Sequence, residues 1–139
     1  MPRYSIIDHP SDAAIEVSGK DSKELFENAA FGMMDMMYDL KSLDIEKYLL
    51  SFNGKVHVTA DNLESLLVAW LSELLYISDS KKMQISVFHI NKMSDNELDA
   101  IVLGGRINKV RTAIKAVTYS QMKILKIGGN LKTTIVFDV

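Results

Sequence analysis

Acidic residues lie near both ends of the chain and could act together as metal ligands. Asp8, His9 and Asp12 lie within five positions of one another near the N-terminus. Asp138 stands one residue before the terminal carboxylate of Val139. If the last strand returns beside the first loop, the carboxylates of Asp12, Asp138 and Val139 converge and repel one another unless a cation or a lysine compensates them. Ligands that are all oxygen select hard ions such as Mg²⁺, Ca²⁺ or Mn²⁺, whereas zinc or copper would require an imidazole such as that of His9.

Spacing alone leaves a second interpretation of these acids open. Asp12 could cap a turn, and Asp138 could be a solvent-facing chain end. The cation site therefore depends on whether the fold brings the two ends of the chain together.

Lys115 is a further candidate for chemistry. In the segment TAIKAVTYS, strand alternation places it on the face of Val117 and Tyr119. A lysine there could neutralise nearby acids or reach a phosphate as a compact cation, or it could be an ordinary solvated residue. The surrounding segment is enriched in basic residues, namely Arg106, Lys109, Arg111, Lys123 and Lys126. It is interpreted either as a contact for a phosphate-bearing partner or as a solvated face.

The first loop contains serine, histidine and aspartate, but their arrangement argues against a hydrolase with a catalytic triad. Asp8, His9 and Ser11 are almost adjacent, whereas a triad gathers side chains from distant segments around a substrate pocket. In an extended loop, Asp8 and His9 would project to opposite sides. His57 and His89 lie in strand patterns, where we expect half-exposed structural residues rather than catalytic bases.

A glycosidase with paired carboxylates remains open, because Asp12 and Asp138 could approach each other across the fold. The sequence offers no evident platform for a sugar, since its only tryptophan, Trp70, lies on the apolar stripe of a predicted helix. The cation site is therefore the preferred interpretation of this acid pair.

Composition limits the function classes. The net charge of −2 argues against a protein that coats nucleic acid, although it leaves room for a local basic patch. The absence of cysteine excludes disulfides, zinc–thiolate sites and thiol nucleophiles. Neither a signal peptide nor a membrane-spanning run is evident. We expect a soluble, cytoplasmic protein with a single domain over residues 1–139.

Two amphipathic helices are predicted to support the site. The first, DSKELFENAAFGMMDMMYDL, begins at Asp21 with Glu24 three residues later, the spacing of a capping box. The second, ADNLESLLVAWLSELLYIS, repeats this spacing with Asp61 and Glu64. The methionines within residues 33–37 are expected to fill the core rather than to bind a cofactor. Apolar faces at helical spacing comprise Leu25, Phe26, Ala29, Ala30, Met33 and Met37 in the first helix, and Leu63, Leu66, Leu67, Trp70, Leu71, Leu74 and Leu75 in the second.

The remaining chain has the patterns of strands. Asn53-Gly54, within YLLSFNGKVHVTA, is typical of a hairpin turn because both residues tolerate positive φ. MQISVFHINKM and ELDAIVLGGRI are predicted to form a second hairpin around SDN. Further strands are expected in IKAVTY, MKILKI and LKTTIVFDV, the last two joined at Gly128-Gly129-Asn130. Gly104-Gly105 is interpreted as a bulge or break, because no helix opens after it as a phosphate loop requires. The sequence thus predicts an α+β domain, with two helices covering largely antiparallel strands.

Four segments, in this order, resemble motifs of the archease family: DHPSD in the first loop, LLVAWLSELLY in the second helix, KAVTYS in a late strand and FDV at the terminus. The resemblance spans nearly the whole chain. It implies an archease-like α+β protein that is not itself an enzyme and serves as a cofactor of the RtcB-type RNA ligase. That ligase joins an RNA end bearing a 2′,3′-cyclic phosphate or 3′-phosphate to a 5′-hydroxyl end, as in tRNA splicing. Archeases are understood to accelerate GTP-dependent guanylylation of the ligase's active-site histidine and to restore multiple turnover.

The resemblance also implies roles for particular residues of this chain. Asp12 in DHPSD and Asp138 in FDV are similar to the family's metal-binding acids. The backbone or terminal oxygens of Val139 would complete that site. Lys115 matches the lysine of the family's KAVTY motif and is expected to be important for activation of the partner.

The rest of the first loop is expected to support the site rather than to form it. Asp8 and His9 would brace the loop. The family more commonly has Thr and Ala where Pro10 and Ser11 stand, and often has His where Ser120 stands. None of these departures touches a predicted ligand.

The expected partners follow from the same resemblance. The RtcB-type ligase is the direct partner, GTP and tRNA are contacted through it, and neither membrane association nor direct nucleic-acid binding is expected. A divalent cation (Ca²⁺, Mg²⁺ or Mn²⁺) would stabilise the charge that builds on phosphate oxygens during guanylyl transfer. Two alternatives stay open: a chaperone-like modulator of a tRNA methyltransferase, and a metal-dependent phosphoester hydrolase.

Overall fold

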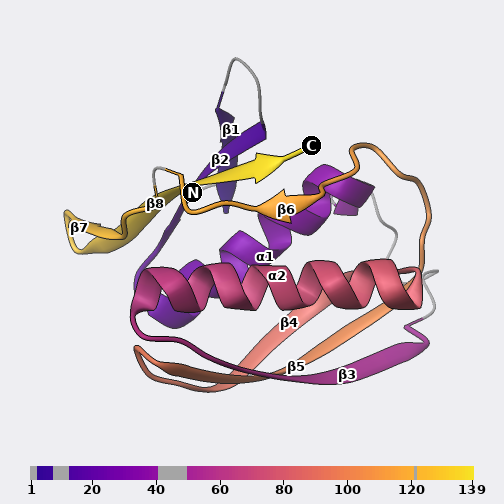
Figure 1. Cartoon of the computed structure of the whole chain (residues 1–139), viewed down its shortest axis with the longest axis horizontal. Helices are drawn as coiled ribbons and strands as arrows, with labels where there is room; N and C mark the ends of the chain where they lie inside the picture. Colours follow the sequence, from indigo (N-terminus) through magenta and orange to yellow (C-terminus); the bar gives the residue numbers. More distant parts are fainter. Residues whose placement is uncertain (1–2, 8–12, 41–49, 121) are drawn as a thin grey trace.

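The computed structural model describes residues 3–7, 13–40, 50–120 and 122–139, and these residues form two helices and two sheets (Figure 1). Their elements, in chain order, are β1 (Tyr4–Ile7), β2 (Ala13–Gly19), α1 (Ser22–Tyr38), β3 (Phe52–Thr59), α2 (Leu63–Lys81), β4 (Met83–Met93), β5 (Glu97–Arg106), β6 (Ala116–Val117), β7 (Leu125–Ile127) and β8 (Asn130–Asp138). The predicted α+β class is confirmed.

The helices lie between the two sheets (Figure 1). The first sheet has the strand order β1-β2-β8-β6, with β7 also paired to β8, and the second has the order β3-β5-β4. Among the described strands every pairing is antiparallel. α1 packs against β2 of the first sheet and β4 of the second, while α2 packs against β6 and β3. Each helix therefore buries side chains on two sides, which explains why its apolar stripe is broad.

The core between the sheets contains the residues that the helical pattern marked as apolar. Trp70 and Phe26 are fully buried, and the indole Nε1 of Trp70 donates a 3.0 Å hydrogen bond to the carbonyl oxygen of Phe26. The four methionines of α1 are buried as well, as expected for flexible side chains that fill an irregular interface. Burial of these side chains supplies most of the driving force for folding.

Helix α1 begins as predicted, whereas the predicted cap of α2 is wrong by one residue. The Asp21 carboxylate accepts a 2.8 Å hydrogen bond from the Glu24 backbone N–H. In α2 the cap is Asn62 rather than Asp61, because the Asn62 side chain accepts from the Ser65 N–H at 2.8 Å. Asp and Asn are both favourable N-cap residues, so the sequence pattern could not tell which of the two neighbouring positions is the cap.

The hairpin predicted at Asn53-Gly54 is wrong. Both residues lie inside β3, where Asn53 pairs with Leu103 and Gly54 with Val102 of β5. Gly54 does not have positive φ. A Cβ at this position would lie 2.8 Å from the ring of Phe52, so the glycine makes room for that ring instead of forming a turn.

The other two predicted hairpins are confirmed. β4 and β5 pair around the SDN turn, which Ser94 N–H closes with a 2.9 Å bond to the Glu97 carbonyl oxygen. β7 and β8 join through Gly128 and Gly129, with φ of 58° and 86°, values that side chains other than glycine rarely adopt. β5 runs unbroken through Gly104, and a register shift lies opposite it in β4.

Candidate functional site

Strand pairing brings the start of β2 beside the end of the chain. In the antiparallel ladder between β2 and β8, Ala13 is the Cα partner of Phe137. Ala13 follows Asp12 in the sequence, and Phe137 precedes Asp138. The last strand thus returns beside the strand that follows the first loop. The loop residues themselves, namely Asp8, His9, Pro10, Ser11 and Asp12, lie outside the described part of the chain.

Asp138 and Val139 are both exposed at the end of β8. Val139 exposes 47% of its surface, and Asp138 beside it is also exposed. The described part of the chain contains no group of three or more His, Asp or Glu side chains that could hold a metal ion. Carboxylate oxygens are hard donors, so the chemistry of these two groups fits Ca²⁺, Mg²⁺ or Mn²⁺ and does not fit soft ions.

The backbone of Lys115 is hydrogen-bonded to the backbone of Asp138. Its N–H donates a 2.8 Å hydrogen bond to the Asp138 carbonyl oxygen, and the next residue, Ala116, is the Cα partner of Asp138. β6 contains only Ala116 and Val117, so Lys115 precedes the strand, and the prediction of its side-chain face from strand alternation does not apply. Lys115 is exposed, whereas Val117 is buried.

A hollow of about 300 Å³ opens between α2 and β6 at this point. Tyr76 and Asp79, both exposed, line it from α2, and Lys115 lines it from the segment before β6. The full lining is Ser72, Leu75, Tyr76, Asp79, Lys115, Ala116 and Val117. Lys115 therefore both lines this hollow and contacts Asp138.

The last turn of α1 contacts two other segments of the chain. The buried carboxylate of Asp35 accepts a 2.6 Å hydrogen bond from the Tyr4 hydroxyl of β1. Burial, and then the bond to Asp35, raise the pKa of the Tyr4 phenol above its usual value. Arg111 also contacts this turn: its backbone N–H donates to the Met37 carbonyl oxygen at 2.7 Å, and its guanidinium pairs with Asp39 at 3.3 Å. The lone acid inside a methionine-rich stretch was the available sequence signal for Asp35.

A second pair missed by the sequence analysis lies in the other sheet. His57 Nδ1 and Asp99 Oδ1 are 2.6 Å apart, and the two residues are Cα partners across β3 and β5. Their side chains expose 57% and 39% of their surface. The two residues are 42 positions apart in the chain, so no local pattern could reveal the pair.

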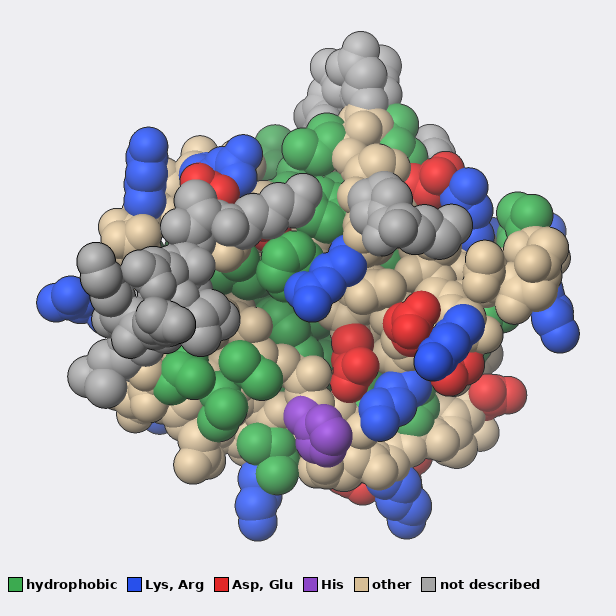
Figure 2. Space-filling view, turned by 180° about the vertical axis from the view of Figure 1, so that it is seen from behind, with side chains coloured by type: hydrophobic (Ala, Val, Ile, Leu, Met, Phe, Trp, Pro, Cys, Tyr) green, Lys and Arg blue, Asp and Glu red, His purple; other side chains and the backbone are tan. Residues whose placement is uncertain are grey.

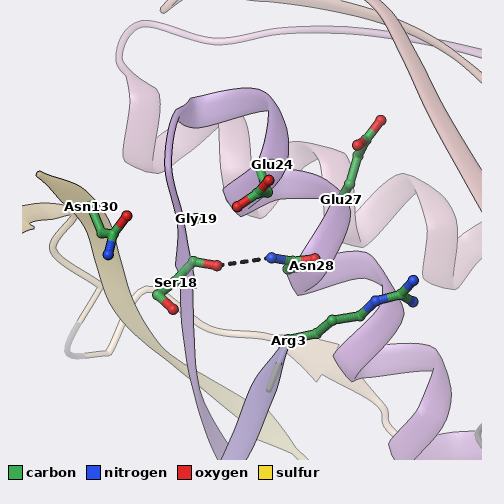
Figure 3. Close-up of a pocket in the computed structure, with 7 residues that line it drawn as sticks. All are labelled: Arg3, Ser18, Gly19, Glu24, Glu27, Asn28 and Asn130. Atoms are coloured by element: carbon green, nitrogen blue, oxygen red, sulfur yellow. Dashed lines mark hydrogen bonds between the residues drawn. The ribbon is translucent and has the colours of Figure 1, made fainter. Parts of the chain in front are cut away.

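Another hollow, of about 380 Å³, lies at the opposite end of the β2–β8 ladder (Figure 3). Its lining is Arg3, Ser18, Gly19, Glu24, Glu27, Asn28 and Asn130. Asn28 donates to the Ser18 carbonyl oxygen at 2.9 Å, and Glu27 accepts from the Ile90 N–H at 3.0 Å. Figure 3 shows that Glu27 and Arg3 do not point toward a common point, and the Arg3 guanidinium lies over the ring of Phe31 in α1, 4.2 Å from its centroid. These polar groups serve the packing of α1 against the two sheets.

Surface charge is mixed on the face turned away from α2 (Figure 2). Among the described side chains visible there, acidic and basic groups are interspersed, with hydrophobic side chains between them. Such a face differs from the concentrated basic surface that phosphate backbones require. In the described part of the chain, neither helix is both long and apolar enough to cross a bilayer.

Comparison with known proteins identifies the family. The model of the Archease protein family (MTH1598/TM1083) matches residues 4–139. A protein archease from Thermoplasma acidophilum is 36% identical over 142 residues, which cover 98% of this chain and 93% of that protein. A protein archease from Methanosarcina mazei is 32% identical over 145 residues, covering 99% and 96%.

Two solved structures have the same fold. The solution structure of protein 1598 from Methanobacterium thermoautotrophicum has a TM-score of 0.79 and 29% identity, with complete coverage of both chains. The crystal structure of an archease from Thermotoga maritima, described as a possible chaperone, has a TM-score of 0.66 and 26% identity, covering 96% of this chain and 94% of that one. The present chain belongs to the archease family.

Proposed function

We propose that this protein activates an RtcB-type RNA ligase by promoting GTP-dependent guanylylation of the ligase and its multiple turnover. It acts in the cytoplasm as a protein cofactor in tRNA splicing and does not join RNA strands itself. The ligase is its direct partner, and GTP and tRNA meet it through the ligase. Membership of the archease family supports this proposal.

The single observation that carries the proposal is the pairing of Ala13 with Phe137. Ala13 and Phe137 are the last pair of this ladder. Asp12 is the residue before Ala13, and Asp138 is the residue after Phe137, so each member of the pair has an acid as its neighbour in the sequence. We infer that Asp12, Asp138 and the carboxylate of Val139 hold a divalent cation (Ca²⁺, Mg²⁺ or Mn²⁺), with Asp8 and His9 supporting the loop. When bound, the ion supplies positive charge beside developing phosphate charge.

The residues of this chain contribute to activation in two ways. Asp138 and Val139, both exposed, give the end of β8 a negative charge that can enter the nucleotide site of the ligase. Lys115 stands beside Asp138 and presents an ammonium group that can pair with a phosphate oxygen of GTP, because lysine binds phosphate as a point charge. In such a reaction positioning and charge stabilisation are the main contributions that a protein can make.

The direct test measures guanylylation of the purified ligase with radiolabelled GTP. Wild-type protein should increase the rate, whereas Asp12→Asn and Asp138→Asn should not, because each removes one negative oxygen ligand. Asp95→Asn is the matched control, since Asp95 is an exposed acid in the turn between β4 and β5. Equal stimulation by all four proteins would contradict the proposed role of the acids.

A deletion distinguishes the alternatives. Removal of residues 138–139 should abolish activation of the ligase, while a chaperone that acts through broad apolar surface should keep its effect on aggregation. The Thermotoga maritima relative is described as a possible chaperone, so aggregation of a test protein is worth measuring in parallel. Hydrolysis of a phosphoester by this protein alone would instead favour a metal-dependent hydrolase.

A further inference from the structure

Arg111, in the segment between β5 and β6 that leads to Lys115, contacts the last turn of α1. Its backbone N–H donates to the Met37 carbonyl oxygen at 2.7 Å. Its Nη1 lies 3.4 Å from the Asp35 carbonyl oxygen and 3.3 Å from Asp39 Oδ1. All three acceptors belong to the end of a single helix, so main chain and side chain of Arg111 contact the same small surface.

A positive charge from outside the helix is favourable at the end of α1. Backbone carbonyls of a last turn have no partner within the helix and carry the negative end of its dipole. In α1, whose residues are all described, the last turn contains no basic residue, while Asp35 lies within it and Asp39 caps it. Arg111 is placed where its charge offsets both the carbonyl oxygens and the Asp39 carboxylate.

Strand β1 also contacts this turn of α1. The Tyr4 hydroxyl donates to the Asp35 side chain at 2.6 Å in a buried position, so this turn is also tied to the first sheet. The turn is therefore a fixed support against which a more exposed segment can be positioned.

Arg111 is close enough to Lys115 to control where Lys115 lies. The two residues are four positions apart, and an extended chain spans roughly 3.5 Å per residue. Between them, Ile114 is buried in the core with 3% of its surface exposed. Lys115 N–H then reaches the Asp138 carbonyl oxygen. Contacts at α1, in the core and at β8 thus fix the segment at three successive points.

We propose that Arg111 is a positioning residue, which holds Lys115 and the β6 edge against Asp138 through its contacts with the last turn of α1. The functional meaning of this role rests on the proposed function of Lys115 and Asp138. The structural part can be tested without the ligase, because it concerns the Lys115 N–H group itself.

The test is amide hydrogen exchange of the full-length protein, followed residue by residue by NMR. In Arg111→Ala the Lys115 amide should exchange faster by about fivefold, the scale expected for loss of a half-exposed ion pair and its hydrogen bond. The Ile15 and Ile135 amides, which lie in the middle of the β2–β8 ladder, should keep their wild-type rates. Arg111→Lys should restore most of the protection, because an ammonium group can still pair with Asp39.

Two further variants make the assignment specific. Asp39→Asn keeps a residue that tolerates the left-handed backbone found there (φ 56°), but it removes the carboxylate charge. It should accelerate exchange at Lys115, and combining it with Arg111→Ala should add little, as expected for partners in one interaction. Lys109→Ala, which changes an exposed lysine of the same segment, is the control and should leave the Lys115 rate unchanged.

Two outcomes would overturn the proposal: an unchanged Lys115 rate in Arg111→Ala, or equal acceleration across the whole β2–β8 ladder. Stimulation of the ligase is measured in parallel. If wild-type protein fails to stimulate guanylylation, the proposed function fails while the exchange result still decides the role of Arg111. If wild type stimulates and Lys115 is released in Arg111→Ala, stimulation should fall in that variant and recover in Arg111→Lys.

Discussion

The backbone N–H of Lys115 donates a 2.8 Å hydrogen bond to the carbonyl oxygen of Asp138. This bond places the basic segment between β5 and β6 beside the final acid of the chain. It uses only backbone atoms, so a side-chain substitution at either position leaves the bond possible. The chemistry of the Lys115 ammonium group and the Asp138 carboxylate can therefore be tested separately from the fold.

Replacement of Lys115 by methionine should abolish stimulation of the ligase with little effect on stability. Methionine has similar length but no charge, so the variant removes the ammonium group that we propose to contact phosphate. Because Lys115 is exposed, the free energy of unfolding should change by less than about 0.5 kcal/mol. Guanylylation assays and urea unfolding measure the two effects. Lys126→Met, at an exposed lysine of β7, is the control, and full activity of Lys115→Met would refute the role.

Binding of a divalent cation should stabilise the folded protein. A ligand that binds only the folded state adds about 2.7 kcal/mol to the free energy of unfolding at roughly 100 times its Kd. Calcium titration should therefore raise the Tm of the wild type, and a chelator should reverse the rise. Asp138→Asn should weaken the response, whereas Asp95→Asn should keep it. A Tm that is independent of calcium, magnesium and manganese in the wild type would exclude the cation site.

Both helices and most strands of this fold follow from local patterns, whereas β1 and β2 were not predicted. Helical spacing marked Trp70 and the methionines of α1 as core residues, and all are buried. The paired glycines at 128 and 129 indicated a tight turn, which only residues that tolerate positive φ can form. Local patterns failed where a tertiary contact decided the outcome, as at Gly54, whose place in β3 is set by pairing with Val102 of β5.

The candidate site was less accessible to local patterns. Asp138 and Lys115 were named from their residue types and again from the family resemblance, but their neighbourhood depends on the order β2-β8-β6, which no spacing in the sequence encodes. The contacts of Asp35 with Tyr4 and of Arg111 with Asp39 join residues 31 and 72 positions apart. Such pairs appear only after the topology is known.

Tyr4 should make the stability of the protein depend on alkaline pH. Burial and the bond to Asp35 raise the pKa of Tyr4 in the folded state, so the folded protein holds this proton more tightly than the unfolded chain does. The contribution is complete below the unfolded pKa of about 10 and is lost as the pH rises from there toward the folded pKa. Tyr4→Phe should therefore lose less stability than the wild type above about pH 10.

At neutral pH the same variant should be less stable by about 1–3 kcal/mol, because Asp35 loses a buried hydrogen-bond donor. Urea unfolding at several pH values measures both effects. Tyr38 also has a raised pKa through burial, but it is present in both proteins, so the difference between them isolates Tyr4. Parallel curves for the two proteins above pH 10 would show that the Tyr4 proton is not held by the fold.

Gly104→Ala should destabilise the protein more than Gly54→Ala, although both glycines lie in the second sheet. A Cβ at Gly104 would lie 2.4 Å from the backbone carbonyl oxygen of Gln84, which is fixed by the β4–β5 ladder. At Gly54 the nearest atoms belong to the Phe52 ring, at 2.8 Å, and a partly exposed side chain can rotate away. Overpacking against backbone should cost about 1–3 kcal/mol, and the Gly54 variant should lose less. Thermal unfolding of both variants tests this difference. Equal Tm values would contradict it, because they would mean that the β4 backbone shifts as easily as the Phe52 side chain.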